Sequence, residues 1–147
     1  MQILKSKVNK LRLGNIIKIY EPKNINFNIN EIPSDEVLSF YNESDCFLMP
    51  SKVESFGIVT IEAMTFGLPV IAASSPGNID ILDNGKFGII YDGTKADLIK
   101  KMKSVIDEKK KLSSYSLKSK IRSKQFDWSY IVDKYLELYS SLIKKKN

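Results

Sequence analysis

The sequence predicts an α/β fold in which a parallel sheet is covered by helices on both sides. Three short apolar segments, residues 46–49, 69–73 and 87–91, have the length and composition of buried strands. Stretches with helical spacing of apolar residues lie between these segments and after them. Short apolar strands that alternate with helices are typical of a parallel sheet whose two faces are both buried.

The first two helices of this alternation are marked by their ends. Ser34 is a good capping residue, and the two acids that follow it favour the start of a helix there. A second helix is predicted over residues 56–66, after the first strand. Gly67 has the conformational freedom to end this helix in the left-handed region, and Pro69 prevents it from continuing.

The later helices are predicted from capping and periodicity. A short helix near residues 79–82 leads to the third strand, and Thr94 with Asp97 three residues later resembles a capping box. A last helix is predicted over residues 127–144. Its apolar face carries Trp128, Ile131, Tyr135, Leu138 and Leu142.

The first 30 residues have a weaker pattern. Residues 15–20 and 25–30 have the composition of strands, but a helix before or between them is also open. The sequence contains no internal repeat, low-complexity linker or evident domain boundary. A single domain over residues 1–147 is therefore expected.

The composition argues against several classes of function. Of the 147 residues, 43% are hydrophobic and 27% charged, as in soluble globular proteins. There is no histidine, and the one cysteine, Cys46, lies in an apolar segment. A zinc site, a disulfide framework and a histidine-based triad are therefore not expected. No apolar run approaches the roughly 20 residues of a membrane span, and no signal peptide is evident, so we expect a cytoplasmic protein.

Lysines dominate the last third of the chain and contribute much of the net charge of +6. We interpret most of them as solvated helix faces. A sharper interpretation is weak peripheral attachment to the anionic inner face of a membrane, worth roughly 1 kcal/mol per lysine near the lipid. Nucleic acid is not expected as a partner, because no RNP-type, zinc-finger or helix-turn-helix motif accompanies the charge.

The most informative segment is residues 51–71, in which two carboxylates, Glu54 and Glu62, are separated by seven residues. If Glu54 begins the predicted helix, Glu62 lies on the order of 12 Å further along its axis, at about 1.5 Å per residue. With Thr65 the two glutamates form one polar stripe on an otherwise apolar helix. This separation suits a nucleotide-sugar, with sugar hydroxyls at one carboxylate and ribose hydroxyls at the other.

The start of the same helix is predicted to bind phosphate. The amides of Phe56, Gly57 and Ile58 have no partner within the helix, and the helix dipole favours anions there. Gly57 also allows a ligand to approach the backbone closely. Simpler interpretations stay open at each position: Glu54 complementing the dipole, Gly57 as a permissive residue, and Glu62 bonded to another part of the protein.

The run from Met49 to Ile71 resembles the donor-site signature of family 4 glycosyltransferases of the GT-B fold. It reads Met49-Pro50-Ser51-x-x-Glu54-Ser-Phe-Gly57-x-x-x-x-Glu62-Ala-Met-x-x-Gly67-x-Pro69-Val-Ile. Two later runs are similar to the segments that follow in that family: Pro76-Gly77-Asn78-Ile-Asp80-Ile-Leu82-x-Asn84-Gly85-x-x-Gly88, and Phe126-x-Trp128 before a final helix rich in tyrosine. The resemblance implies a Rossmann-like parallel sheet covered by helices, as the incomplete C-terminal half of a GT-B enzyme.

The resemblance also implies a role for each site residue. Glu54, as the catalytic residue of the set, is expected to contact the donor sugar, and Glu62 the ribose. Asp80 stands where the family usually has a glutamate. The residues expected to contact the phosphates and the sugar-phosphate are Ser55, Phe56, Gly57, Ile58, Gly77 and Asn78. Such enzymes use a nucleotide-diphosphate sugar as substrate, so no cofactor and no metal is expected.

The leading interpretation is the donor-binding part of a retaining glycosyltransferase, which transfers a sugar from a nucleotide-sugar to a glycan or lipid-linked acceptor in surface polysaccharide or glycolipid synthesis. These 147 residues hold no counterpart of the family's acceptor domain or of its diphosphate-clamping Arg and Lys-Gly segment, so the chain alone is not expected to be active. The alternative is a non-catalytic remnant or a partner subunit of a split glycosyltransferase. In the family the last helix packs on the acceptor domain. Its apolar face is therefore expected to bind an acceptor-domain chain or a second copy.

Overall fold

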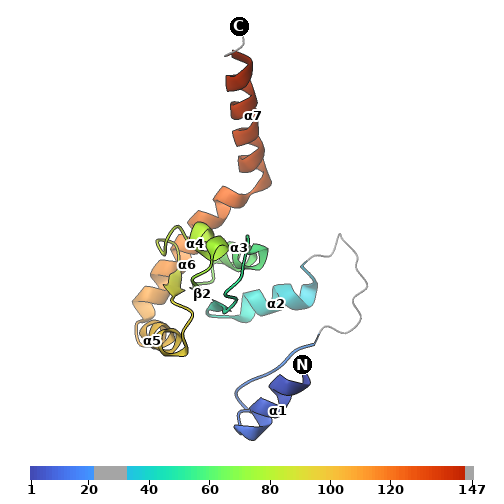
Figure 1. Ribbon diagram of the computed structural model, residues 1–147, viewed down its shortest axis with the longest axis vertical. Coiled ribbons are helices and arrows are strands. Elements are labelled where there is room, and N and C mark those ends of the chain that lie inside the picture. Colours follow the sequence, from blue (N-terminus) through green and yellow to red (C-terminus); the bar gives the residue numbers. More distant parts are fainter. Residues whose placement is uncertain (22–32, 145–147) are drawn as a thin grey trace. The chain divides into compact units, whose positions relative to one another are not determined.

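The computed structural model describes residues 1–21 and 33–144 (Figure 1). The chain consists of two compact units, Met1–Ser34 and Asp35–Asn147. In the first unit, helix α1, Gln2–Lys10, is followed by turns. Of the two possibilities for this region, the helix forms and the strand at residues 15–20 does not.

The segment after α1 folds back on the helix instead of extending. The amides of Ile16 and Ile17 donate to the carbonyl of Leu13, at 2.9 and 2.8 Å, and so close a turn where a strand was predicted. Apolar side chains of α1 and of this segment line a common groove. Among the described residues of this unit, none forms a strand. The other predicted strand, at residues 25–30, lies outside the described residues.

The second unit is built on a parallel sheet of three strands. They are β1, Phe47–Met49, β2, Val70–Ala73, and β3, Ile89–Tyr91, and they lie in the order β1-β2-β3. Leu48 pairs with Ile71, which in turn pairs with Ile89. Each strand lies inside its predicted segment but starts one or two residues later. The predicted fold class, an α/β sheet with parallel strands, is confirmed.

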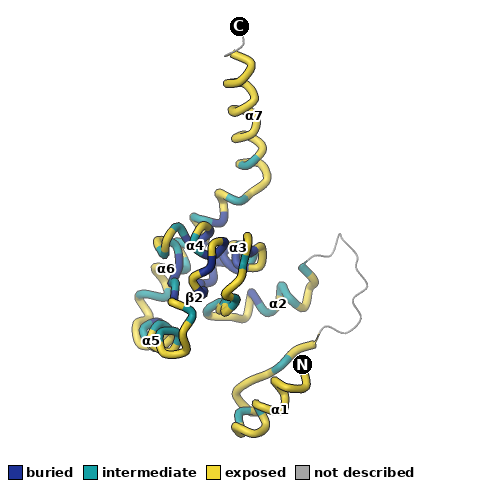
Figure 2. The backbone as a smooth tube through the Cα atoms, in the orientation of Figure 1, coloured by how far each residue is buried: buried dark blue, intermediate teal, exposed yellow. Residues whose placement is uncertain are grey.

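Helices cover both faces of this sheet. The helices of this unit are α2, Asp35–Glu43, α3, Ile58–Thr65, α4, Pro76–Ile81, α5, Lys95–Ile106, α6, Lys109–Ser123, and α7, Trp128–Lys144, with a 3-10 turn at Lys124–Phe126, and α3 to α6 pack on the sheet. Val70 and Ala72 of β2 pack against α3 and α4 on one face. Ile71 and Ala73 pack against α5 and α6 on the other. All four residues of β2 are therefore buried (Figure 2).

The end of α3 agrees with its prediction in detail. Gly67 has a φ of +76°, and its amide donates to the carbonyl of Met64 while the amide of Leu68 donates to that of Ala63. This pair of bonds is the Schellman motif. The buried hydroxyl of Ser119, in α6, donates to the carbonyl of Leu68 at 2.8 Å and joins the two helices at this end.

Two helices, α3 and α4, begin at other residues than predicted, whereas the predicted cap of α5 is present. Helix α3 begins at Ile58 and not at residue 56, because Gly57 takes a left-handed φ of 88° that interrupts the helical backbone. Helix α4 begins at Pro76, three residues early, since proline is favoured in a first helical turn. The capping of α5 is confirmed: the amide of Asp97 donates to Thr94 Oγ1 at 3.2 Å.

Helix α7 has the predicted bounds within one residue but contains no buried residue. Figure 2 shows it exposed along almost its whole length. Of its predicted apolar face, Trp128 is 79% exposed and Leu138 52%. None of the described helices combines the length and the apolar character that crossing a membrane requires.

Candidate functional site

Three loops meet at the edge of the sheet where its parallel strands end. The loop after β1 contacts the start of α4, because the amide of Gly77 donates to the carbonyl of Glu54 at 2.9 Å. It also contacts the loop after β3, where a Cβ atom on Gly93 would lie 3.3 Å from Lys52 Cε. Ligands of α/β proteins bind outside this edge of the sheet, which makes it the candidate site.

Gly77 allows the loop after β1 and the start of α4 to touch through their backbones. A Cβ atom at this position would lie 2.8 Å from the carbonyl oxygen of Glu54 and from the amide nitrogen of Phe56. Both are backbone atoms, which cannot rotate away as the end of a side chain can. Gly77 therefore lies against the protein's own chain, and its contact with a sugar-phosphate stays a prediction.

Glu54 lies in the loop before α3 and not in the first turn of that helix, which begins at Ile58. The interpretation that Glu54 complements the helix dipole from within the helix is therefore wrong. The separation of about 12 Å from Glu62 assumed a helical Glu54, and it stays a prediction. The Glu54 side chain is half-buried. Its carboxylate accepts no hydrogen bond from a described residue, so it is available to a donor from a ligand.

Consecutive amides without partners precede α3 and begin it. The amides of residues 55–58 donate to no described residue, and the first bond of the helix runs from the Thr60 amide to the carbonyl of Gly57, at 2.9 Å. The side chains of Phe56 and Ile58 are exposed. Unpaired amides at a helix start attract anions. The donors that the predicted phosphate site requires are therefore present.

Three buried polar atoms close to these loops have no partner among the described residues: Thr60 Oγ1, Ser75 Oγ and Asn78 Oδ1. Asn78 is fully buried, and its side-chain nitrogen donates to the carbonyl of Ala73 at 3.1 Å. Its side chain thus holds the loop after β2 and does not face a ligand at the surface. The predicted contact of Asn78 with a ligand stays a prediction. Buried polar atoms without partners are uncommon in folded proteins, and these three lie beside the candidate site.

Glu62 has a partner that the sequence analysis missed. The hydroxyl of Tyr41, on α2, donates to Glu62 Oε2 at 2.9 Å. The sequence leaves two kinds of donor open for Glu62, a ligand hydroxyl or another part of the protein. The structure contains a donor of the second kind, Tyr41. Burial, the hydrogen bond to Glu62 and the charge of Glu62 raise the pKa of Tyr41 well above its usual value, so the phenol stays protonated. The two residues are on different helices, so no periodicity connects them.

Arg122 is a second residue that sequence reasoning missed. From the end of α6 it donates to the carbonyls of Ile81 and Asp80, both at 2.8 Å. Its guanidinium also lies against the rings of Phe87 and Phe126. Arg122 thereby satisfies the last carbonyls of α4 and fixes that helix from the end opposite the candidate site. In the sequence it is one of many basic residues, and no signal separated it from them.

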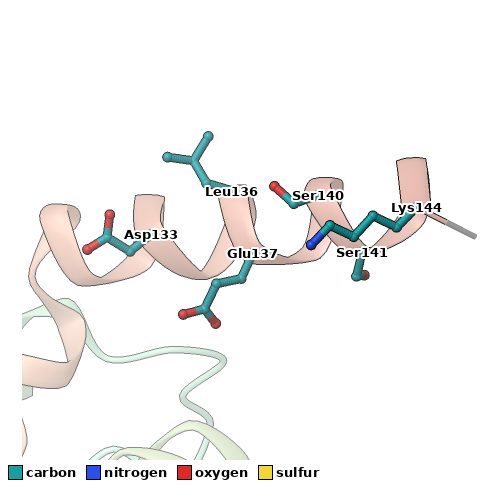
Figure 3. Close-up of a pocket in the computed structure, with 6 residues that line it drawn as sticks. All are labelled: Asp133, Leu136, Glu137, Ser140, Ser141 and Lys144. Atoms are coloured by element: carbon teal, nitrogen blue, oxygen red, sulfur yellow. The ribbon is translucent and has the colours of Figure 1, made fainter.

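Among the described residues, neither a concavity on α7 nor any cluster of metal-binding side chains forms a second candidate site. Figure 3 shows a concavity whose lining residues are Asp133, Leu136, Glu137, Ser140, Ser141 and Lys144. All six belong to α7, so this is the side of one helix and not an enclosed cavity. Within residues 1–21 and 33–144, His, Cys, Asp and Glu side chains nowhere gather in a group of three that might hold a metal ion. Metal-free chemistry stays a prediction.

Comparison with known proteins places the chain in a family. The family described as "Glycosyl transferases group 1" matches residues 6–122. The chain is 34% identical over 106 residues to the D-inositol 3-phosphate glycosyltransferase of Rhodococcus jostii, covering 71% of this chain and 24% of that protein. It is 31% identical over 117 residues to the sulfoquinovosyl transferase of Arabidopsis thaliana, covering 76% and 23%. The chain thus spans about a quarter of the length of these relatives.

Solved structures confirm the fold. Sucrose-phosphate synthase from Thermosynechococcus elongatus superposes with a TM-score of 0.76 at 20% identity, covering 98% of this chain and 34% of that one. The Anabaena protein HepE, solved in complex with UDP, superposes with a TM-score of 0.77 at 24% identity, covering 95% and 36%. The matched residues include both glutamates and all three loops of the candidate site. The chain therefore belongs to the glycosyl transferases group 1 family.

Proposed function

We propose that the chain is the donor-binding part of a retaining family 4 glycosyltransferase, which transfers a sugar from a nucleotide-diphosphate sugar to a glycan or lipid-linked acceptor in surface polysaccharide or glycolipid synthesis. One observation carries the proposal: at the carboxyl edge of the sheet a carboxylate without a partner, Glu54, lies directly before four unpaired amides at the start of α3. The complexes of HepE with UDP and with UDP-glucose support a donor of this class.

In this proposal each group at the edge receives a part of the donor that matches its charge. The amides of residues 55–58 bind the diphosphate, because they are unpaired donors at the positive end of a helix dipole. Glu54, as an acceptor, binds hydroxyls of the donor sugar, and Glu62 binds those of the ribose. Gly77 lets the start of α4 approach the loop that carries the amides. Neither a cofactor nor a metal takes part.

Transfer also requires an acceptor domain, which we propose is supplied by another chain or by further sequence. The exposed apolar face of α7 supports this, since nine of its large apolar residues are accessible. They are Trp128, Tyr130, Val132, Tyr135, Leu136, Leu138, Tyr139, Leu142 and Ile143. Self-association through the same face is the competing use of this surface. The protein works in the cytoplasm, with its lysines at the inner face of the membrane.

A nucleotide titration tests the proposal. The purified chain is titrated calorimetrically with UDP, GDP and ADP, and we expect saturable binding of one of them. Glu62→Gln should weaken that binding, whereas Glu36→Gln, an exposed position on α2, should leave it unchanged. Glu54→Gln should weaken binding of the corresponding nucleotide-sugar more than binding of the nucleotide alone. Absence of binding to all three nucleotides would reject a working donor site and favour the alternative, a non-catalytic partner subunit.

A further inference from the structure

Tyr41 connects α2 to Glu62 on α3, and the proposed function gives Tyr41 itself no role. It is 7% exposed, and its ring lies 5.4 Å from that of Phe66 and 6.1 Å from that of Phe47, measured between centroids. Its hydroxyl lies 2.9 Å from Glu62 Oε2 and 3.5 Å from the carbonyl oxygen of Val59. Packing thus fixes the ring, and the hydroxyl donates a hydrogen bond to one oxygen of Glu62.

The hydrogen bond from Tyr41 limits the rotamers of the Glu62 side chain but leaves most acceptor positions of its carboxylate free. A free glutamate side chain samples many rotamers, and ordering it on ligand binding costs entropy. A phenol donates one hydrogen, whereas a carboxylate has two oxygens and about four acceptor positions. One bond to Oε2 therefore holds the side chain in place, while Oε1 and the remaining lone pairs stay free to accept. Glu62 is only half-buried, so these positions are within reach of a ligand.

We propose that Tyr41 is a positioning residue, which holds the Glu62 carboxylate in the orientation that accepts the hydroxyls of a nucleotide's ribose. This role rests on the proposed function of the same site. It makes Tyr41 the residue on which the preference of the site for ribose over 2′-deoxyribose depends. An acceptor fixed before binding distinguishes a ribose from a 2′-deoxyribose, because the missing hydroxyl leaves a desolvated carboxylate without its donor. A mobile glutamate would turn toward solvent and lose that selectivity.

The experiment compares a nucleoside diphosphate with its 2′-deoxy counterpart, for whichever of UDP, GDP and ADP binds. Calorimetric titration gives the ratio of the two dissociation constants. In the wild-type chain we expect the ribonucleotide to be preferred about tenfold, the effect of one hydrogen bond to a charged group. In Tyr41→Phe we expect a preference of about threefold or less, with an affinity for the deoxynucleotide that is unchanged or higher, because the released carboxylate can turn toward solvent. That variant retains the ring that packs against Phe47 and Phe66.

The deoxynucleotide separates positioning from structural damage, since a distorted site would bind both ligands less well. Tyr139→Phe, on the exposed face of α7, controls for the loss of a phenol elsewhere. If Tyr41→Phe does not fold, the wild-type ratio is compared with that of Glu62→Asp, whose shorter side chain withdraws the carboxylate from the Tyr41 hydroxyl. An unchanged ratio in either variant, or an equal loss for both ligands, would overturn the positioning role. A wild-type chain that binds no nucleotide would instead reject the proposed function, and the positioning role with it.

Discussion

The candidate site and helix α7 are opposite cases within one chain. At the site, the backbones of the β1 loop and α4 approach so closely that a single Cβ atom on Gly77 would lie 2.8 Å from its neighbours. In α7, no residue is buried, although the helix is rich in aromatic and aliphatic side chains. Apolar composition therefore does not decide what a segment contributes to stability. Contacts with the rest of the described chain decide that contribution. We therefore expect substitutions at the site to change the free energy of unfolding, and substitutions in α7 to change self-association.

The largest loss of stability is expected at the point of closest approach. Gly77→Ala should lower the free energy of unfolding by about 3 kcal/mol, because the new methyl group meets backbone atoms that can separate only if the loop or α4 shifts. Urea unfolding followed by circular dichroism measures this. Gly14→Ala, where nothing lies within 4 Å, is the control and should change stability by less than about 0.5 kcal/mol. Equal stability of the two variants would show that the loops have room to separate.

A smaller loss is expected behind the site, where Arg122 holds the end of α4. Arg122→Met keeps much of the aliphatic volume but leaves the carbonyl of Ile81 without its donor, and that of Asp80 with only the amide of Asp83, at 3.3 Å. We expect a loss of about 2 kcal/mol, in the range for hydrogen bonds to a charged group. Lys124→Met, at an exposed position two residues later, should have little effect in the same unfolding assay. If both variants unfold alike, the end of α4 does not depend on the guanidinium.

The bond between α6 and the end of α3 should contribute less again. Ser119→Ala removes the hydroxyl that donates to the carbonyl of Leu68 and leaves this buried acceptor unpaired. We expect a loss of about 1 to 2 kcal/mol in the free energy of unfolding. Ser114→Ala, at an exposed position on the same helix, is the matched control. A loss at Ser119 no larger than at Ser114 would mean that solvent replaces the bond without penalty.

The smallest effect on unfolding is expected in α7. Leu138→Ser replaces an exposed apolar side chain, so the stability of the dilute chain should change by less than about 0.5 kcal/mol. The same variant should weaken self-association, because at about 100° per residue all the large apolar side chains of α7 except Tyr130 occupy one continuous arc that includes Leu138. Sedimentation velocity over a concentration series measures this, with Asp133→Asn on the polar face as control. A wild-type chain that stays monomeric would rule out a second copy as the partner of α7.

Much of the fold followed from local patterns. The sequence predicts the strands because each is a short apolar run, and the end of α3 because Gly67 favours a left-handed end and Pro69 prevents the helix from continuing. The starts of α3 and α4 were placed wrongly. The apolar run after Glu54 predicts that this residue is helical, whereas the left-handed Gly57 separates it from the helix. A glycine permits several backbone conformations, and its neighbours in space decide among them.

The sequence by itself determined the family, the parallel sheet and the pair of glutamates, because each depends on residue types at fixed spacing along the chain. The tertiary structure alone decided the partners of the site. Tyr41 reaches Glu62 across 21 residues, and Arg122 reaches Ile81 across 41. The same is true of the exposure of α7, whose pattern is that of a packed helix but in which no residue is buried. Periodicity shows which side of a helix is apolar, but only the folded chain shows what, if anything, covers that side.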